Sequence, residues 1–406
     1  MRAGWNRNGP LWITAACAAP GALLRFAPHA WPAPGAALAF GATVAAAAFV
    51  LAWAAEAAEQ DLSRGVALAL LALVAVLPEF AVDGTFAWLA GRHPGYLAFP
   101  LANMTGANRI LIGWGWPLVV AVVWKRHGAR RVSLDRAQLK KVAVLLAATA
   151  FSFWIAARRS LTLFDAIVLL GLFALYVWRL PTAAGAPSHA VGMARRLAER
   201  PRRRRRWLLA ALVSAAAAAI LLVSEPFARA LVAAGSLFGV SQFYLVQWLA
   251  PLASELPEFV VVSIFAWHAA GGRALEALIS SKVSQWTLLV SLLPVIYSLS
   301  RGHWTALPLT QLESRELLLT GAQSLFAALI LLDLALDRRD AAALWVLFTV
   351  QLAVPEWRLP VTAIYFALAA LALVRHRRGV ARAARALWRS EPAAGPPPAA
   401  ARDRRR

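Results

Sequence analysis

The residues of this chain most able to do chemistry are two glutamates, Glu79 and Glu258, each preceded by a proline inside an apolar run. An ionised glutamate near the middle of a bilayer costs at least ~2.5–3 kcal/mol, so a glutamate placed there is a candidate for function. A proline just before it removes one helix hydrogen bond and frees a carbonyl oxygen. Carboxylate and carbonyl oxygens together are cation ligands, and we therefore expect a cation site.

The two glutamates belong to one short sequence that occurs twice. The stretch LPEFAVDGTFAW at Leu77–Trp88 reappears as LPEFVVVSIFAW at Leu256–Trp267, with eight of the twelve positions identical. The repetition indicates an internal duplication in which each copy supplies one carboxylate to the site.

Other oxygen-bearing side chains share a helix face with these glutamates. Asp83 follows Glu79 by four residues and Glu255 precedes Glu258 by three, so each pair of carboxylates lies about one turn apart. Ser254 adds a hydroxyl four residues before Glu258. Four carboxylates in the middle of a membrane cannot all stay ionised alone, so metal ions, protons or a built-in cation must balance them.

Lys282 is the candidate for a built-in cation. Its ammonium beside the two glutamates could occupy the place of a transported Na⁺, or it could lose and regain a proton in each cycle. We hypothesise that Lys282 lowers the number of coupling cations and favours proton-coupled or low-stoichiometry exchange.

The elements that must position these residues are membrane helices. The 406-residue chain is 60% hydrophobic and only 15% charged, with a mean hydropathy of +0.60, whereas soluble proteins average about 45–50% apolar and 25% charged residues. Apolar runs of about 20 residues recur from end to end, which is typical of a polytopic α-helical membrane protein. No alternating pattern of a transmembrane β-barrel is visible.

The apolar segments predict ten core crossings and two flanking helices. The core crossings are expected at 35–58, 66–90, 97–124, 139–157, 162–180, 207–234, 243–269, 275–299, 317–337 and 341–354. The flanking segments are 11–27 and 359–375. The piece at 341–354 is short for a full span and could be re-entrant.

The net charge of +22 follows the positive-inside pattern of membrane proteins. Basic residues gather at 125–141, 195–206, 375–389 and 402–406. A twelve-segment topology places all of these stretches and both termini on the cytoplasmic side of a bacterial-type inner membrane. Arg158 and Arg159 are the exception and fall on the outer side. We expect anionic lipids at the basic loops and no nucleic acid as a partner.

The LPEF sequence falls on the second crossing of each five-segment half. Because five is odd, the halves enter the membrane in opposite senses and form an inverted repeat that brings the glutamates together near the midplane. We predict an all-α polytopic membrane protein with two inverted five-helix repeats, a ten-helix core and about twelve helices in total. The predicted regions are an N-terminal segment with an extra helix (1–34), the first half (35–180), a basic cytoplasmic loop (181–206), the second half (207–354), an extra C-terminal helix (355–378) and a disordered basic tail (379–406).

At these residues the chain resembles the calcium/cation antiporter superfamily, whose familiar members are sodium/calcium exchangers. In that family each inverted half carries a Gly-Thr-Ser-Leu-Pro-Glu-like motif on one helix and a Gly-Asn…Gly-Ser-Asn-like motif on the next. This chain shows LVAVLPEF (Leu73–Phe80) and LANMTGANRI (Leu101–Ile110) within 73–124, then PLASELPEF (Pro251–Phe259) and LISSKVSQWTLL (Leu278–Leu289) within 251–299.

The resemblance implies a Ca²⁺ site in which Glu79 and Glu258 are the central carboxylates. By position, Ser254 carries the hydroxyl of the second repeat, and Asn103 and Asn108 carry the amides of the first. Ser280, Ser281, Ser284 and Gln285 supply further polar atoms on the facing helix.

The chain also departs from the family pattern. Ala75 and Val76 replace the hydroxyl pair of the first repeat. Lys282 stands where the second repeat would carry an amide or an acid, and Arg109 directly follows Asn108. The competing interpretation is therefore that the motif glutamates are structural and pair with these two cations.

The sequence favours a secondary active antiporter that moves Ca²⁺ or another cation against Na⁺ or H⁺ by alternating access. A monovalent cation/proton antiporter and a non-transporting scaffold that keeps the fold are the alternatives. We find no Walker loop, nucleophile elbow or metal-ligand histidine pair, so no enzyme activity is expected. No cofactor is expected beyond the transported cations. Asp165 and Asp333 stand alone in the sequence and receive no role.

Overall fold

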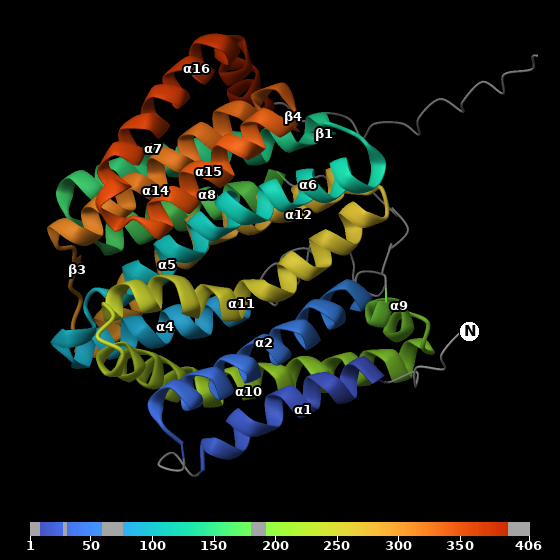
Figure 1. Ribbon diagram of the computed structural model, residues 1–406, viewed down its shortest axis with the longest axis vertical. Helices are drawn as coiled ribbons and strands as arrows, with labels where there is room; N and C mark the ends of the chain where they lie inside the picture. Colours follow the sequence, from blue (N-terminus) through green and yellow to red (C-terminus); the bar gives the residue numbers. More distant parts are fainter. Residues whose placement is uncertain (1–8, 27–30, 59–75, 180–191, 389–406) are drawn as a thin grey trace, which may run out of the picture.

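The computed structural model describes residues 9–26, 31–58, 76–179 and 192–388. The described chain is almost entirely helical (Figure 1). Its α-helices are α1 (Gly9–Leu24), α2 (Ala33–Ala58), α4 (Leu77–Arg92), α5 (Phe99–Ile110), α6 (Trp116–His127), α7 (Leu139–Arg158), α8 (Leu163–Arg179), α9 (Gly192–Ala198), α10 (Arg202–Leu237), α11 (Gln242–Trp267), α12 (Gly271–Ser284), α13 (Val290–Arg301), α14 (Gln311–Ile330), α15 (Arg338–Ala353) and α16 (Arg358–Trp388).

Eight helical stretches of the described chain are long and apolar enough to cross a membrane. Two of them, Pro94–His127 and Gly271–Arg301, are composite and run through a wide turn of π-helix. The π-turns are η2 (Leu111–Gly115) and η4 (Gln285–Leu289), and they join α5 to α6 and α12 to α13. The helical content and the long apolar helices of the described residues confirm the prediction of an all-α integral membrane protein.

Two short strand pairs link loops that are far apart in the sequence. β1 (Arg131–Ser133) pairs antiparallel with β4 (Ala335–Asp337), and β2 (Ser160–Leu161) pairs antiparallel with β3 (Leu307–Pro308). Each pair ties a loop of the first half of the chain to a loop of the second half.

The helices pack as a bundle with a peripheral group on one side. α10 lies along α2, and α1 lies along both of them, at the lower edge of Figure 1. At the opposite edge α14 packs against α7 and α16. Between these groups α5 contacts α11 and α4 contacts α13, so the helices that carry the repeated sequence lie in the interior.

α5 is buried on all sides, which explains why its sequence lacks a solvent-facing polar stripe. Every residue of α5 is buried, including Asn103, Asn108 and Arg109. Gly106 lets α5 approach α11 closely, since a Cβ at this position would lie 1.7 Å from the backbone carbonyl oxygen of Gln247. Small residues at helix crossings allow this kind of contact in membranes.

Two of the predicted boundaries are wrong. The segment 379–388 is helical and continues α16 beyond a kink at His376, whereas we predict a disordered tail from 379. Ala383 is buried, and Val380 and Leu387 pack against the main apolar core, so the arginine-rich segment has an apolar face that its composition hides. The predicted basic loop 181–206 likewise contains α9 and the start of α10.

Some predictions fall outside the described residues. These are the tail at 389–406, the first part of the basic loop (181–191), the start of the second crossing (66–75) with Ala75, and the first residues of the LVAVLPEF motif, which begins at Leu73.

The short segment predicted at 341–354 is an ordinary α-helix, α15.

Candidate functional site

The candidate cation site lies where α4, α5, α11 and α12 meet. Glu79 is in the first turn of α4 and is 1% exposed, and among the described residues neither of its carboxylate oxygens has a hydrogen-bond partner. Glu258 on α11 is half-buried and lies within electrostatic range of Glu79. The two motif glutamates therefore face the same region from different halves of the chain, as the duplication predicts.

Asp83 lies one turn after Glu79 and points into the same interior region. It is fully buried, and its Oδ1 accepts a hydrogen bond of 2.7 Å from Nδ2 of Asn103 on α5. Oδ2 of Asp83 and Oδ1 of Asn103 have no hydrogen-bond partner in the described part of the chain. Both oxygens are thus available to a ligand.

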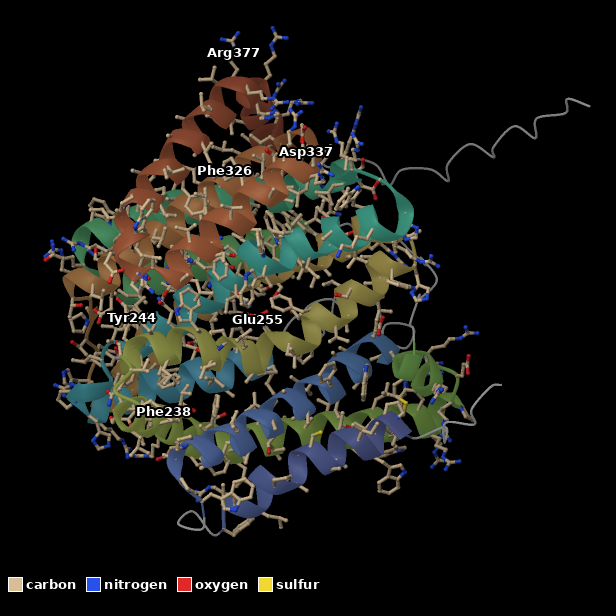
Figure 2. All side chains as sticks on the ribbon, in the orientation of Figure 1. Phe238, Tyr244, Glu255, Phe326, Asp337 and Arg377 are labelled. Atoms are coloured by element: carbon tan, nitrogen blue, oxygen red, sulfur yellow. The ribbon has the colours of Figure 1, made fainter. Side chains whose placement is uncertain are left out.

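Glu255 provides the corresponding carboxylate on α11, near the centre of the bundle in Figure 2. Gln285, the first residue of the π-turn η4, donates a hydrogen bond to Oε1 of Glu255. Oε2 of Glu255 and Oε1 of Gln285 have no hydrogen-bond partner within the ranges that the structure describes. An acid and an amide again present one unpartnered oxygen each, as Asp83 and Asn103 do.

The hydroxyl groups contribute less to this region than the sequence suggests. Ser254 donates its hydroxyl to the carbonyl oxygen of Pro251 on its own helix, at 3.1 Å. Ser281 lies beside Glu258. Ser280 contacts Lys141 instead, with Nζ to Oγ at 2.8 Å.

The two motif prolines have different structural effects. Pro257 lies inside α11, which runs unbroken from Gln242 to Trp267, so it removes one internal hydrogen bond as expected. Pro78 lies in the first turn of α4. A helix makes no internal N–H bond at that position, so the expected loss of a helix bond in the first copy is wrong.

Lys282 is fully buried, but it is not held between the glutamates. Its Nζ donates to Oδ1 of Asn108 at 2.6 Å and lies 4.1 Å from the ring centre of Trp286. Among the described residues its ammonium makes no ion pair within 4.0 Å, although it is within electrostatic range of Glu255. The prediction that Lys282 sits beside two glutamates is wrong in this detail, and Asn108 is its direct partner.

Arg109 belongs to a second buried polar cluster that the sequence does not reveal. Its Nη2 contacts Oε2 of Glu316 on α14 at 2.6 Å, and its Nη1 donates to Oε1 of Gln351 on α15 at 2.8 Å. Arg358, at the start of α16, contacts Oε1 of Glu316 at 2.6 Å. Gln247 of α11 also donates to Glu316, at 3.0 Å. We name these five residues the arginine cluster.

The aspartates without an assigned role have structural partners. Arg158 and the backbone N–H of Thr162 both donate to Oδ2 of Asp165, which lies at the start of α8. This pair also accounts for a basic residue on the side opposite to the other basic loops. Asp333 contacts Arg131 at 3.1 Å beside the β1–β4 pair.

The predicted ligands do not form a closed metal cage. No group of three or more His, Cys, Asp or Glu side chains in the described part of the chain is close enough to hold a metal ion. Ca²⁺ takes six to eight oxygen ligands. The region is therefore rich in unpartnered oxygens, but its carboxylates would have to approach one another to surround a cation.

The chain is similar to known proteins both in sequence and in fold. The family described as sodium/calcium exchanger protein matches residues 32–180 and 208–355. A solved structure titled as the H⁺/Ca²⁺ exchanger CAX is 39% identical, with a TM-score of 0.89 over 94% of this chain and 98% of that one. No match was found among curated proteins.

Two more distant structures share the fold. Native YfkE is 15% identical, with a TM-score of 0.61 over 84% of this chain and 98% of that one. A structure of the sodium-calcium exchanger NCX_Mj is 16% identical, with a TM-score of 0.51 over 85% of this chain and 99% of that one.

Proposed function

We propose that this chain, which belongs to the sodium/calcium exchanger family of the calcium/cation antiporter superfamily, exchanges Ca²⁺ for H⁺. Homology supports a cation antiporter that handles Ca²⁺, and this is the predicted function class. The family consists of secondary transporters and not of enzymes. The observation that carries the choice of coupling ion is the set of buried carboxylate oxygens without protein partners.

Buried carboxylates without cationic partners must take up either metal ions or protons. Glu79, Asp83 and Glu255 are each at most 1% exposed, and each has at least one oxygen without a hydrogen-bond partner in the described ranges. Three ionised carboxylates in such a place are strongly disfavoured. Two protons carry the same charge as one Ca²⁺, so these acids can bind either two protons or one Ca²⁺ in turn.

Sodium coupling has less support from the side chains. Na⁺ would need neutral oxygens in addition to carboxylates, and the hydroxyl that the family places before the first motif is replaced by Val76. The Ser254 hydroxyl is directed to a backbone carbonyl, and Oδ1 of Asn108 is occupied by Lys282. The relative at 39% identity carries an H⁺/Ca²⁺ exchanger title, which favours the same coupling.

We further propose that the two halves form an inverted repeat of a ten-helix core and expose the site alternately to the two sides. The supporting observations are the two π-turns, which interrupt the third helix of each half, and the two strand pairs. A twofold relation between the halves would exchange the β1–β4 pair with the β3–β2 pair. Alternating access in inverted-repeat transporters moves one part of the protein against the other around a fixed site.

We propose a bacterial-type inner membrane as the location, with both termini in the cytoplasm. The basic stretches at 125–141 and 195–206 support this orientation. A reporter enzyme that is active only in the cytoplasm, fused after Arg406, should be active. If only a reporter that works in the periplasm is active at that position, the proposed orientation is wrong.

The test is uptake of radioactive Ca²⁺ into proteoliposomes, with pH and Na⁺ gradients imposed separately. Uptake should follow the pH gradient and should fall to background in Glu79→Gln and Glu258→Gln. Glu225→Gln is the matched control, because this residue is exposed and pairs only with Arg229 among the described residues. Uptake driven by Na⁺ alone would refute proton coupling, and unchanged uptake in both motif variants would refute the site.

A monovalent cation/proton antiporter is the second candidate. It is favoured by one observation, the buried ammonium of Lys282 bound to an amide that the family uses as a ligand position. In the same vesicles, flux of Na⁺ or K⁺ without any Ca²⁺ flux would establish this function. If the folded protein transports none of the cations tested, the non-transporting scaffold would be the remaining interpretation.

Lys282→Asn tests the role of the buried ammonium. If Lys282 replaces a coupling cation, Ca²⁺ uptake by the variant should depend on Na⁺ or on pH in a different way from the natural protein. Lys125→Asn is the control, since this lysine is exposed at the end of α6. Identical ion dependence in both variants and in the natural protein would exclude a coupling role for Lys282.

A further inference from the structure

The peripheral helices form a groove that the transport site does not use. The groove has a volume of about 1050 Å³ and lies between α1, α2, α9 and α10. These helices form the lower part of the molecule in Figure 1. One end of the groove is lined by arginines and the rest by apolar side chains. We name it the α1–α10 groove.

The arginine end of the groove is held in place by the structure. Nη1 of Arg205 donates to the carbonyl oxygens of Ala198 and Arg200, at 2.7 and 2.9 Å, and so ties the end of α9 to α10. Met193 and Leu197 anchor α9 in a small apolar cluster with α2. The arginines that line this end are Arg196, Arg200, Arg203 and Arg204.

The charge at this end is strongly one-sided. The segment from α9 to the first turn of α10 (192–206) carries eight arginines and a single acid, Glu199. Glu199 pairs with Arg195 on the exposed side. A basic pocket between membrane helices on the cytoplasmic side is the usual setting for an acidic lipid headgroup.

The apolar part of the groove has the length of one lipid leaflet. It is lined on α10 by residues from Trp207 to Ala219, and on α2 by Ala46, Ala47 and Val50. From Arg204 to Ala219 the helix rises by roughly 22 Å. One leaflet contributes about half of the ~30 Å hydrocarbon core, and the remainder is headgroup depth.

We propose that the α1–α10 groove binds one anionic phospholipid of the leaflet that faces the arginine-rich side. The phosphate and the acidic headgroup contact Arg200, Arg203 and Arg204, and an acyl chain lies along α10 between α1 and α2. A free phosphate ion would leave the apolar wall uncovered. A zwitterionic lipid would bring its own cation against the arginines.

The proposal is tested by lipid retention on the purified protein. The protein is incubated with vesicles of phosphatidylglycerol or of phosphatidylcholine, extracted in mild detergent and weighed by native mass spectrometry. Phosphatidylglycerol should be retained in preference to phosphatidylcholine. The triple variant Arg200→Gln, Arg203→Gln, Arg204→Gln should bind phosphatidylglycerol roughly 100-fold more weakly, since each arginine near an anionic headgroup contributes to affinity.

Two further variants separate the groove from general charge attraction. Arg377→Gln, Arg378→Gln, Arg382→Gln removes the same charge from α16, far from the groove, and should keep full retention (Figure 2). Ala215→Trp fills the groove wall without a change of charge and should reduce retention. Equal retention of the two lipids, or equal loss in both triple variants, would overturn the proposal. Neither readout depends on transport.

Discussion

The candidate cation site and the arginine cluster both contain buried acids, and the two regions treat them in opposite ways. Glu316 in the arginine cluster accepts from two guanidiniums and one amide, so both of its oxygens are partnered. Glu79 in the candidate cation site has no hydrogen-bond partner on either oxygen among the residues that the structure describes. The two residues are equally buried, at 2% and 1% exposed.

The contrast is between a carboxylate with fixed cationic partners and a carboxylate without them. A carboxylate that carries its own cations has a fixed charge balance, and it can hold helices together without regard to the ions in solution. A buried carboxylate without a fixed cation is neutralised by a proton or by a metal ion, which makes it a candidate for function. The interpretation of the motif glutamates as partners of Lys282 and Arg109 is disfavoured for the same reason, since those cations bind Asn108 and Glu316.

The largest expected effect is on the arginine cluster. Glu316→Gln leaves two buried guanidiniums without a counter-charge, and we expect the free energy of unfolding to fall by about 3–5 kcal/mol. The same substitution at Glu79 removes no ion pair and should change it by less than about 1 kcal/mol. Denaturant unfolding of the purified proteins in detergent measures both values. Equal destabilisation by the two substitutions would erase the distinction between the regions.

A smaller effect is expected at the start of α8. Asp165→Asn weakens the contact with Arg158 and the hydrogen bond from the Thr162 backbone, so we expect a loss of about 1–2 kcal/mol. Asp135→Asn is the control, because Asp135 is exposed and makes no capping bond with its side chain. The same unfolding assay applies. A loss at Asp165 as large as that at Glu316 would mean that burial of the cations matters less than we infer.

The smallest effect is expected at the surface. Arg131 and Asp333 lie 3.1 Å apart, but their side chains are 54% and 37% exposed. Exposed pairs contribute about 0.2–1 kcal/mol and are screened by salt. We therefore expect Arg131→Gln to lower the free energy of unfolding by less than about 1 kcal/mol. The decrease should be smaller still in roughly 0.5 M salt, because salt screens the pair. A loss that is insensitive to salt would contradict this.

The sequence predicts features that depend on spacing along one helix. The duplication places Glu79 and Glu258, and the four-residue and three-residue intervals place Asp83 and Glu255 beside them. Hydropathy predicts the helices themselves, because each apolar run must find a lipid or helix neighbour.

Partners on different helices depend on rotation and depth, which a single sequence does not contain. For this reason the Lys282–Asn108 bond is missed. Glu316 and Arg358 are missed because each lies one residue before a predicted apolar segment, 317–337 and 359–375. Hydropathy starts each of these two segments just after the charged residue, even though that residue is buried in the structure.

The strand pairs and the arginine cluster also constrain how the protein is made. β1 ends at Ser133 and its partner β4 begins at Ala335, so the pair forms only after most of the chain has been synthesised. Arg109 enters the membrane with α5, long before Glu316 exists to neutralise it. The first half must therefore wait in a provisional state, with its guanidinium near the lipid headgroups or water, until translation of α14 allows assembly to finish.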